Sequence, residues 1–225
     1  MFYTVRGASM IVGGKEKSVQ IKANNKTAGF FIKKYIGMRI IIIALSIVAM
    51  SGLYLMYAWN RYQDEASSQA IELAKTIQTV MPKQHIGKLS GSSEDLNNPT
   101  YIMIKKNLSQ LVETTNPIHF AYIMAERADN IIILMDSESP DSPDYSPPGQ
   151  VYEEADDVFR EPFKTGQTII SKPISDRWGT WICVLVPIKE ATSNSVVAVF
   201  GIDYAVSEWY AQIWKHMIPD IIIVI

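Results

Sequence analysis

The longest apolar run of the chain predicts a transmembrane helix. Residues 40–59 contain no charged side chain, and Arg39 and Arg61 lie just outside the two ends. A helix rises about 1.5 Å per residue, so about 20 apolar residues cross the hydrocarbon core of a bilayer. The run also lacks the polar stripe of an ordinary core helix. A cleaved signal peptide is the alternative, but its apolar region is shorter and precedes a small-residue cleavage site, which the sequence after Trp59 lacks.

The residues after this span follow a helical period. Between 62 and 81, apolar positions recur at spacings of four and three, which predicts a helix continuous with the span. The two heptads predict a parallel homodimer through this helix, and the alternative is a helix that packs on its own domain. A second amphipathic helix is expected from Asn98 and Pro99, an N-cap and a first helical position, to about Asn116. The heptad seam consists of Ala66, Ala70, Leu73, Ile77 and Val80.

The pattern then changes from helical to alternating. Two apolar stretches flank a turn at 128–130, which predicts a β-hairpin. A proline-rich loop at 137–150 and a short acidic helix at 152–164 follow, and a last helix starts near Val206. Short connections between strands imply an antiparallel sheet with helices over its faces. The prediction is an α+β fold, with a five-stranded antiparallel sheet, a long N-terminal helix and a transmembrane helix. The expected strands are 118–125, 131–136, 168–174, 180–188 and 196–204.

Charge orients the chain in the membrane. Residues 1–39 carry eight Lys or Arg and one acid, a net charge of +7, whereas the remainder carries −9. Basic residues next to a span are retained on the cytoplasmic side. We therefore expect a cytoplasmic basic tail at 1–39 and an extracytoplasmic domain at 60–217. The tail shows no periodicity, so it is either disordered or lies upstream of a start at Met38.

The C-terminal residues 218–225 end in an apolar run that is too short to cross a membrane. They fit the start of a truncated second transmembrane helix, and the alternative is an apolar tail packed on the domain.

Three segments resemble a known family of sensor domains. SPDYSPPGQVYEEADDVF, ISKPISDRWGTWICVLVPI and VVAVFGIDYAVSEW resemble the extracytoplasmic, PAS-like PDC or Cache domains found in front of histidine kinase and diguanylate cyclase modules. The D-x-W-G-x-W-x-x-x-x-x-P-I pattern starts at Asp176, and the resemblance covers about residues 60–212. It implies a PAS-like sheet between two spans that senses a small ligand. The sequence contains no kinase or cyclase module.

Six residues are candidates for the ligand site. Arg177 carries a donor fork suited to carboxylates, and Trp178 and Trp181 beside it offer flat apolar walls. Asp203 ends an apolar strand, where a buried acid requires a cation, a ligand amine or solvent. Tyr122 lies mid-strand and points either into a pocket or into the core, and Lys172 is a further candidate. The structural alternative is an Arg–Trp stack that fixes a strand end. These residues predict a small polar or carboxylate-bearing ligand.

Other chemistries lack support in the sequence. The three His are scattered without a zinc spacing, and the acids at 153–157 are explained by a helix start. No phosphate loop or nucleophile motif is present, so we expect no metal, cofactor or catalytic residue. The outer region is acidic, which argues against nucleic acid. Cys183 is expected to be a buried hydrophobe. The favoured function is a sensor, and the alternatives are an accessory membrane protein without ligand or an anchored enzyme.

Overall fold

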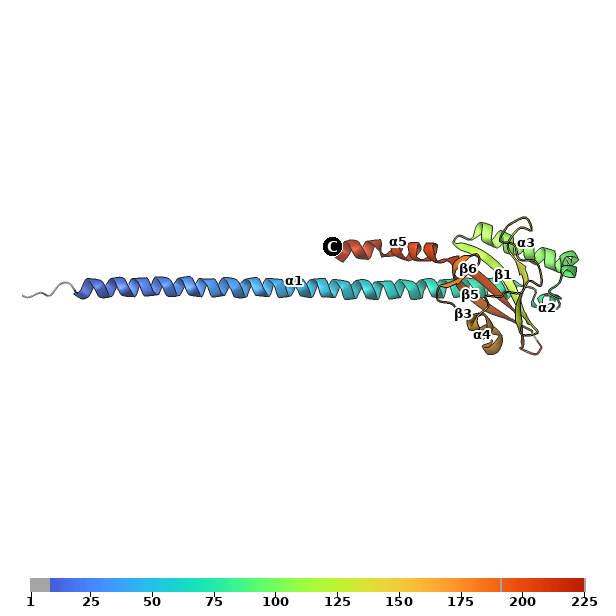
Figure 1. Cartoon of the computed structure of the whole chain (residues 1–225), viewed down its shortest axis with the longest axis horizontal. Helices are drawn as coiled ribbons and strands as arrows, with labels where there is room; N and C mark the ends of the chain where they lie inside the picture. The colour runs from blue at the N-terminus through green and yellow to red at the C-terminus, as the bar shows by residue number, and fades with distance from the viewer. Residues whose placement is uncertain (1–8, 191, 225) are drawn as a thin grey trace, which may run out of the picture. The chain divides into compact units, whose positions relative to one another are not determined.

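The predicted membrane span lies within one helix, α1, which extends over Ser9–Val80 in the computed structural model (Figure 1). The structure describes residues 9–190 and 192–224, with side chains from residue 34 onward. The backbone of 9–39 is helical rather than a disordered tail, and residues 1–8 of that tail lie outside the described residues. Within the described part of the chain, α1 alone is long and apolar enough to cross a membrane.

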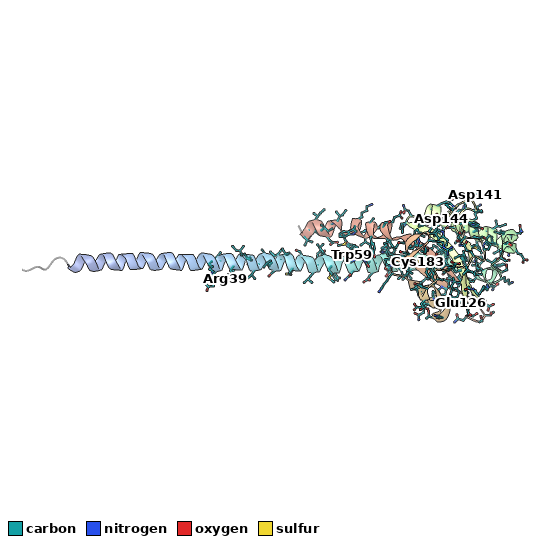
Figure 2. All side chains as sticks on the ribbon, viewed as in Figure 1. Arg39, Trp59, Glu126, Asp141, Asp144 and Cys183 are labelled. Atoms are coloured by element: carbon teal, nitrogen blue, oxygen red, sulfur yellow. The ribbon has the colours of Figure 1, made fainter. Side chains whose placement is uncertain are left out.

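The chain divides into two parts, one that ends at Tyr57 and one that begins at Ala58. In the first part, most side chains from Ile40 to Tyr57 are exposed and none is buried by protein. Figure 2 labels Arg39 and Trp59 at the two ends of this apolar stretch. An apolar helix without protein cover is what a lipid-facing span requires.

The second part begins with helices whose ends follow local sequence signals. Asn98 caps α3 with its side-chain oxygen, which accepts a hydrogen bond from Thr100 N at 2.9 Å, and Pro99 takes the first helical position. The expected acidic helix starts later than predicted, because Tyr152 N donates to Ile131 O at 2.9 Å and holds that segment beside a strand. The helices are α2 (Lys83–Ile86), the 3-10 helix η1 (Ser93–Asn97), α3 (Pro99–Thr114), α4 (Asp157–Thr165) and α5 (Val206–Val224).

An antiparallel sheet forms the centre of the domain, in the order β2-β1-β6-β5-β3, with β4 paired to β5. The α+β class is therefore confirmed, but the predicted strand 168–174 is two short strands. Pro173 lies between them and has no N–H for a ladder, so the chain leaves β3 and pairs again as β4. The strands are β1 (Ile118–Arg127), β2 (Asn130–Asp136), β3 (Ile169–Ile170), β4 (Ile174–Asp176), β5 (Gly179–Lys189) and β6 (Val196–Ala205).

The two faces of the sheet carry different neighbours. On one face, α4 packs through Phe159 onto a cluster that includes Met124, Leu185 and the predicted buried Cys183 (labelled in Figure 2). The residues that alternate with these, such as Ile123, are also fully buried. α1 contacts a sheet carbonyl through Gln78, whose Nε2 donates to Pro187 O at 3.1 Å.

The heptad seam of α1 faces its own domain over most of its length. Ala70 is buried, and Ala66, Leu73 and Ile77 are half-buried, whereas Val80 is 81% exposed. Ala66, Ala70 and Leu73 line a groove of about 220 Å³ together with Trp209 and Ile213 of α5. Further along the same pair of helices, Tyr62 Oη donates to Asp220 Oδ2 at 2.8 Å.

Candidate functional site

A cavity of about 50 Å³ lies on the sheet face that carries the α4 cluster. Its floor comes from alternate residues of β1 together with Asp203 of β6 and residues of β2, and its walls come from the loop after β2 and the turn at the end of β4. The strands place these side chains on one face because residues two apart in a strand point the same way. The cavity is lined by Phe120, Tyr122, Met124, Ile133, Asp136, Glu138, Asp144, Ser146, Tyr152, Asp176, Trp178 and Asp203.

Asp203 is the most buried of the acids that line the cavity. In the sheet it lies opposite Phe120 of β1 and Cys183 of β5, and it is 5% exposed. Burial raises the pKa of its carboxyl to about 7, although hydrogen bonds from the Cys183 thiol and the Tyr122 hydroxyl act in the opposite direction. No ion pair forms with Asp203 among the described side chains.

Tyr122 reaches Asp203 because the residue across the ladder is a glycine. The Tyr122 hydroxyl donates to Asp203 Oδ1 at 2.9 Å. Gly201 pairs with Tyr122, and a Cβ there would lie 2.2 Å from Tyr122 Cε2. The missing side chain of Gly201 therefore leaves the space in which the tyrosine ring lies flat over β6.

Asp176 organises the second wall. Its Oδ1 accepts hydrogen bonds from the backbone N–H of Trp178 at 2.9 Å, from that of Gly179 at 3.0 Å and from the Trp181 indole at 2.9 Å. The Tyr152 hydroxyl donates to Oδ2 at 3.1 Å. The D-x-W-G-x-W pattern thus builds a turn: its aspartate holds the backbone, and its first tryptophan lines the cavity.

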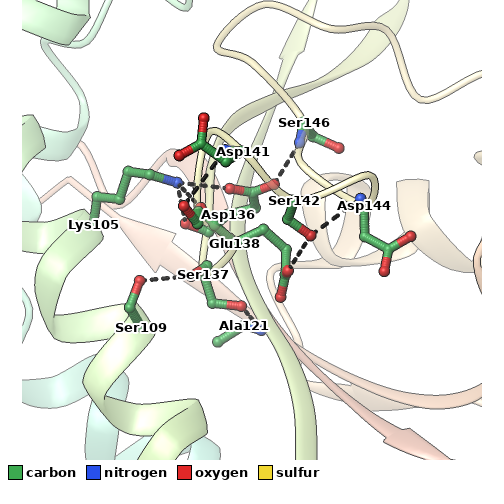
Figure 3. Close-up of polar contacts among 11 residues, drawn as sticks. Lys105, Ser109, Ala121, Asp136, Ser137, Glu138, Asp141, Ser142, Asp144 and Ser146 are labelled. Atoms are coloured by element: carbon green, nitrogen blue, oxygen red, sulfur yellow. Dashed lines mark hydrogen bonds and ion pairs between the residues drawn. The ribbon is translucent and has the colours of Figure 1, made fainter.

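A polar network fixes the loop at 137–150 over the cavity (Figure 3). Lys105 of α3 donates to Asp136 Oδ1 at 2.9 Å and to Glu138 O at 2.6 Å. Asp136 Oδ2 accepts from Ser146 N at 2.6 Å, ten residues further along the chain. Burial raises the pKa of Asp136, and the Lys105 ammonium counteracts this rise. The two ends of the loop are therefore held at one carboxylate.

The structure brings three of the six predicted site residues together. Tyr122, Trp178 and Asp203 line the cavity, whereas Lys172 is exposed and outside its lining. Trp181 is buried and packs on Phe120, with ring centroids 4.9 Å apart, so it supports the wall from behind.

Arg177 also lies outside the lining. Its Nε and an Nη each donate to the Glu154 carboxylate at 2.7 Å, and its guanidinium carbon lies 5.2 Å from the Trp178 ring centroid. The hydrogen bond to Glu154 raises the pKa of Arg177 and lowers that of Glu154. This arrangement matches the Arg–Trp stack that the sequence left open as the structural alternative.

Sequence reasoning missed the acidic wall from the loop after β2. Asp136 ends an apolar strand as Asp203 does, which was a usable signal, but Glu138 and Asp144 lie in a segment that reads only as exposed loop. Among the side chains described from residue 34 onward, no group of three or more His, Cys, Asp or Glu is arranged to hold a metal ion. The cavity therefore offers carboxylates and aromatic rings as its binding groups.

Comparison with known proteins gives matches among solved structures. No protein-family model matches the sequence, and no curated protein sequence is significantly similar to it. The ligand-binding domain of the Campylobacter jejuni chemoreceptor Tlp3, solved with L-valine, is 14% identical, with a TM-score of 0.41; the match covers 74% of this chain and 66% of that one. The extracellular domain of soHK1S-Z6, described as a histidine kinase, is 17% identical with a TM-score of 0.42. That match covers 66% of this chain and 59% of the other. The chain thus spans less than two thirds of either length.

Proposed function

We propose that this chain is the extracytoplasmic ligand-sensing part of a transmembrane signalling receptor. The observation that carries this function is the position of the cavity floor relative to α5. Asp203 lines the cavity, and α5 begins at Val206, three residues later in the same continuous backbone. A ligand that moves Asp203 therefore displaces the start of an outgoing helix.

Contacts between α5 and α1 offer a route from that displacement to the membrane. Trp59 stacks on Tyr210 with ring centroids 5.8 Å apart, and Tyr62 is hydrogen-bonded to Asp220. These pairs join the outgoing helix to the last residue of the predicted span, Trp59, and to Tyr62 just after it. A shift of α5 along α1 would change which side chains meet at this junction, which is a discrete rearrangement of the kind that packed helices undergo.

The proposed topology keeps residues 1–39 in the cytoplasm, 40–59 in the bilayer and 60–217 outside the cell membrane, with 218–225 opening a second span. The charge asymmetry of the sequence supports this orientation. Reporter fusions at Lys15 and at Ser92 should give opposite sidedness. A cytoplasmic signal from the Ser92 fusion would reverse the orientation and with it the extracytoplasmic function.

A homodimer through the membrane-proximal helix is part of the same proposal. Because Ala70 is buried and Ala66, Leu73 and Ile77 are half-buried, Val80 is the most accessible residue of the seam. In a Cys183→Ser background, Val80→Cys should crosslink between subunits more readily than Lys75→Cys, which lies on another face of the helix. Equal crosslinking at both positions would remove the case for this interface.

The sensing function is tested on the full chain in lipid nanodiscs. A library of carboxylates, amines, sugars and nucleosides is screened for a rise in melting temperature. Spin labels at Gln69→Cys and Gln212→Cys, in a Cys183→Ser background, then report the α1–α5 distance with and without each hit. A pair at Asp64→Cys and Glu72→Cys, within α1 alone, is the control and should not change. Hits that leave the Gln69–Gln212 distance unchanged would contradict coupling through α5.

A further inference from the structure

The cavity carries negative charge without a matching cation in its lining. Of its twelve lining residues, five are acidic and none is Lys, Arg or His. Lys105 approaches from outside the lining and is engaged by Asp136. Asp176 accepts hydrogen bonds from uncharged donors. Asp203 accepts hydrogen bonds only from the Tyr122 hydroxyl and the Cys183 thiol. A carboxylate ligand would therefore add repulsion to a site that already lacks counter-charge.

The remaining lining is aromatic and apolar. The rings of Phe120, Tyr122, Tyr152 and Trp178 face the same space as these carboxylates, and the Tyr152 and Trp178 ring centroids are 6.1 Å apart. Aromatic faces attract cations and also accept alkyl groups. An inorganic cation would instead require several oxygen ligands in a compact shell, and Met124 and Ile133 supply none.

Size limits the ligand further. The cavity has a volume of about 50 Å³. By the same measure one water molecule needs about 10–15 Å³, so the cavity accepts only a few non-hydrogen atoms. Building on the proposed sensing function, we infer that the cavity binds a small organic ammonium ion, with the nitrogen against Asp203 and the alkyl groups against Phe120, Tyr122, Tyr152 and Trp178. The bound cation supplies the counter-charge that the chain itself does not provide.

Three probes of nearly equal size separate charge from shape: propylammonium, propan-1-ol and propionate. Their binding to the full chain in nanodiscs is measured at pH 8 by calorimetry, together with tetramethylammonium and ethanolammonium. We expect binding by the ammonium ions and none by propionate. Asp203→Asn should weaken ammonium binding ten- to a hundredfold, because a charge-assisted contact is lost.

Two further variants control for structure. Trp178→Leu should weaken tetramethylammonium about fivefold through the lost ring. Glu190→Gln removes a negative charge outside the cavity lining and should leave binding unchanged. Asp203→Asn is isosteric and removes an uncompensated buried charge, so it is expected to fold.

The outcomes distinguish this inference from the sensing function on which it rests. If propionate or propan-1-ol binds as well as propylammonium, or if Asp203→Asn leaves ammonium binding intact, the ammonium assignment is wrong. If no ammonium ion binds but a carboxylate or sugar from the library binds and shifts α5, the sensing function stands and the ligand class is overturned. If nothing in either set binds the folded chain, both are overturned.

Discussion

Two buried carboxylates line the same cavity, and the chain treats them differently. Asp136, at the end of β2, has its own cation in Lys105 and a backbone donor from Ser146. Asp203, near the end of β6, has hydroxyl and thiol partners only. The comparison separates a carboxylate that holds the structure together from one whose charge is left unbalanced. Burial alone does not identify a binding residue; in our proposal, burial without a counter-charge inside a cavity marks Asp203 as the residue that contacts the ligand.

The largest expected effect is the loss of the structural pair. Lys105→Met leaves Asp136 buried without its cation, which should destabilise the domain by roughly 3 kcal/mol and lower its melting temperature by roughly 10 °C. Lys106→Met, on an exposed position of the same helix, is the control and should change little. Equal melting temperatures for the two variants would show that Asp136 does not depend on Lys105.

The second effect is a steric clash with Tyr122, which lines the cavity. Gly201→Ala places a Cβ 2.2 Å from the Tyr122 ring, so the ring must leave its position over β6. We expect a loss of about 2 kcal/mol in unfolding free energy and weaker ammonium binding. Gly87→Ala is the control, because its nearest neighbour, Val197, would lie at 3.5 Å. A stable Gly201→Ala protein with unchanged binding would mean that the Tyr122–Asp203 contact is dispensable.

The third effect is a pH dependence. The pKa of Asp203 is raised from 3.8 to about 7, so between these values the folded chain holds a proton that the unfolded chain releases. Stability should therefore rise as pH falls from 8 to 5. The pKa of Asp136 is raised as well, so only the difference between wild type and Asp203→Asn, which keeps Asp136, reports Asp203. We expect the variant to be more stable at pH 8 and its advantage to shrink towards pH 5. A constant difference across this range would contradict a raised pKa for Asp203.

The smallest effect concerns Arg177. Its pair with Glu154 is partly exposed and lies outside the cavity lining, so Arg177→Ala should barely change the melting temperature and should leave ammonium affinity unchanged. Arg127→Ala, another exposed arginine, gives the baseline. A tenfold loss of affinity in Arg177→Ala alone would return Arg177 to the ligand site that the sequence predicts.

The sequence predicts those features of this protein that depend on residues close together in the chain. The helix start at Asn98, the hairpin turn and the buried Cys183 rest on neighbouring residues and periodicity, and the structure has them. Pro173 is a local signal that divides the strand at 168–174, because proline has no backbone N–H for the ladder.

The partners of charged residues could not be predicted in this way. Glu154 lies 23 residues before Arg177, and Lys105 lies 31 before Asp136, so packing alone decides that these charges meet. Asp136 and Asp203 look alike in sequence, since each closes an apolar strand. Their difference appears only when α3 brings Lys105 to one of them.

The anchored loop at 137–150 has a consequence for the speed of the proposed sensing. Its four prolines and the bond from Asp136 to Ser146 fix this wall before any ligand arrives. Association then does not include ordering the loop, which would otherwise cost about 0.5–1.5 kcal/mol for each immobilised side chain. A small ligand that enters a ready-made site can exchange quickly even when it binds weakly. A receptor built in this way would follow changes in concentration over time and would keep little memory of earlier exposure.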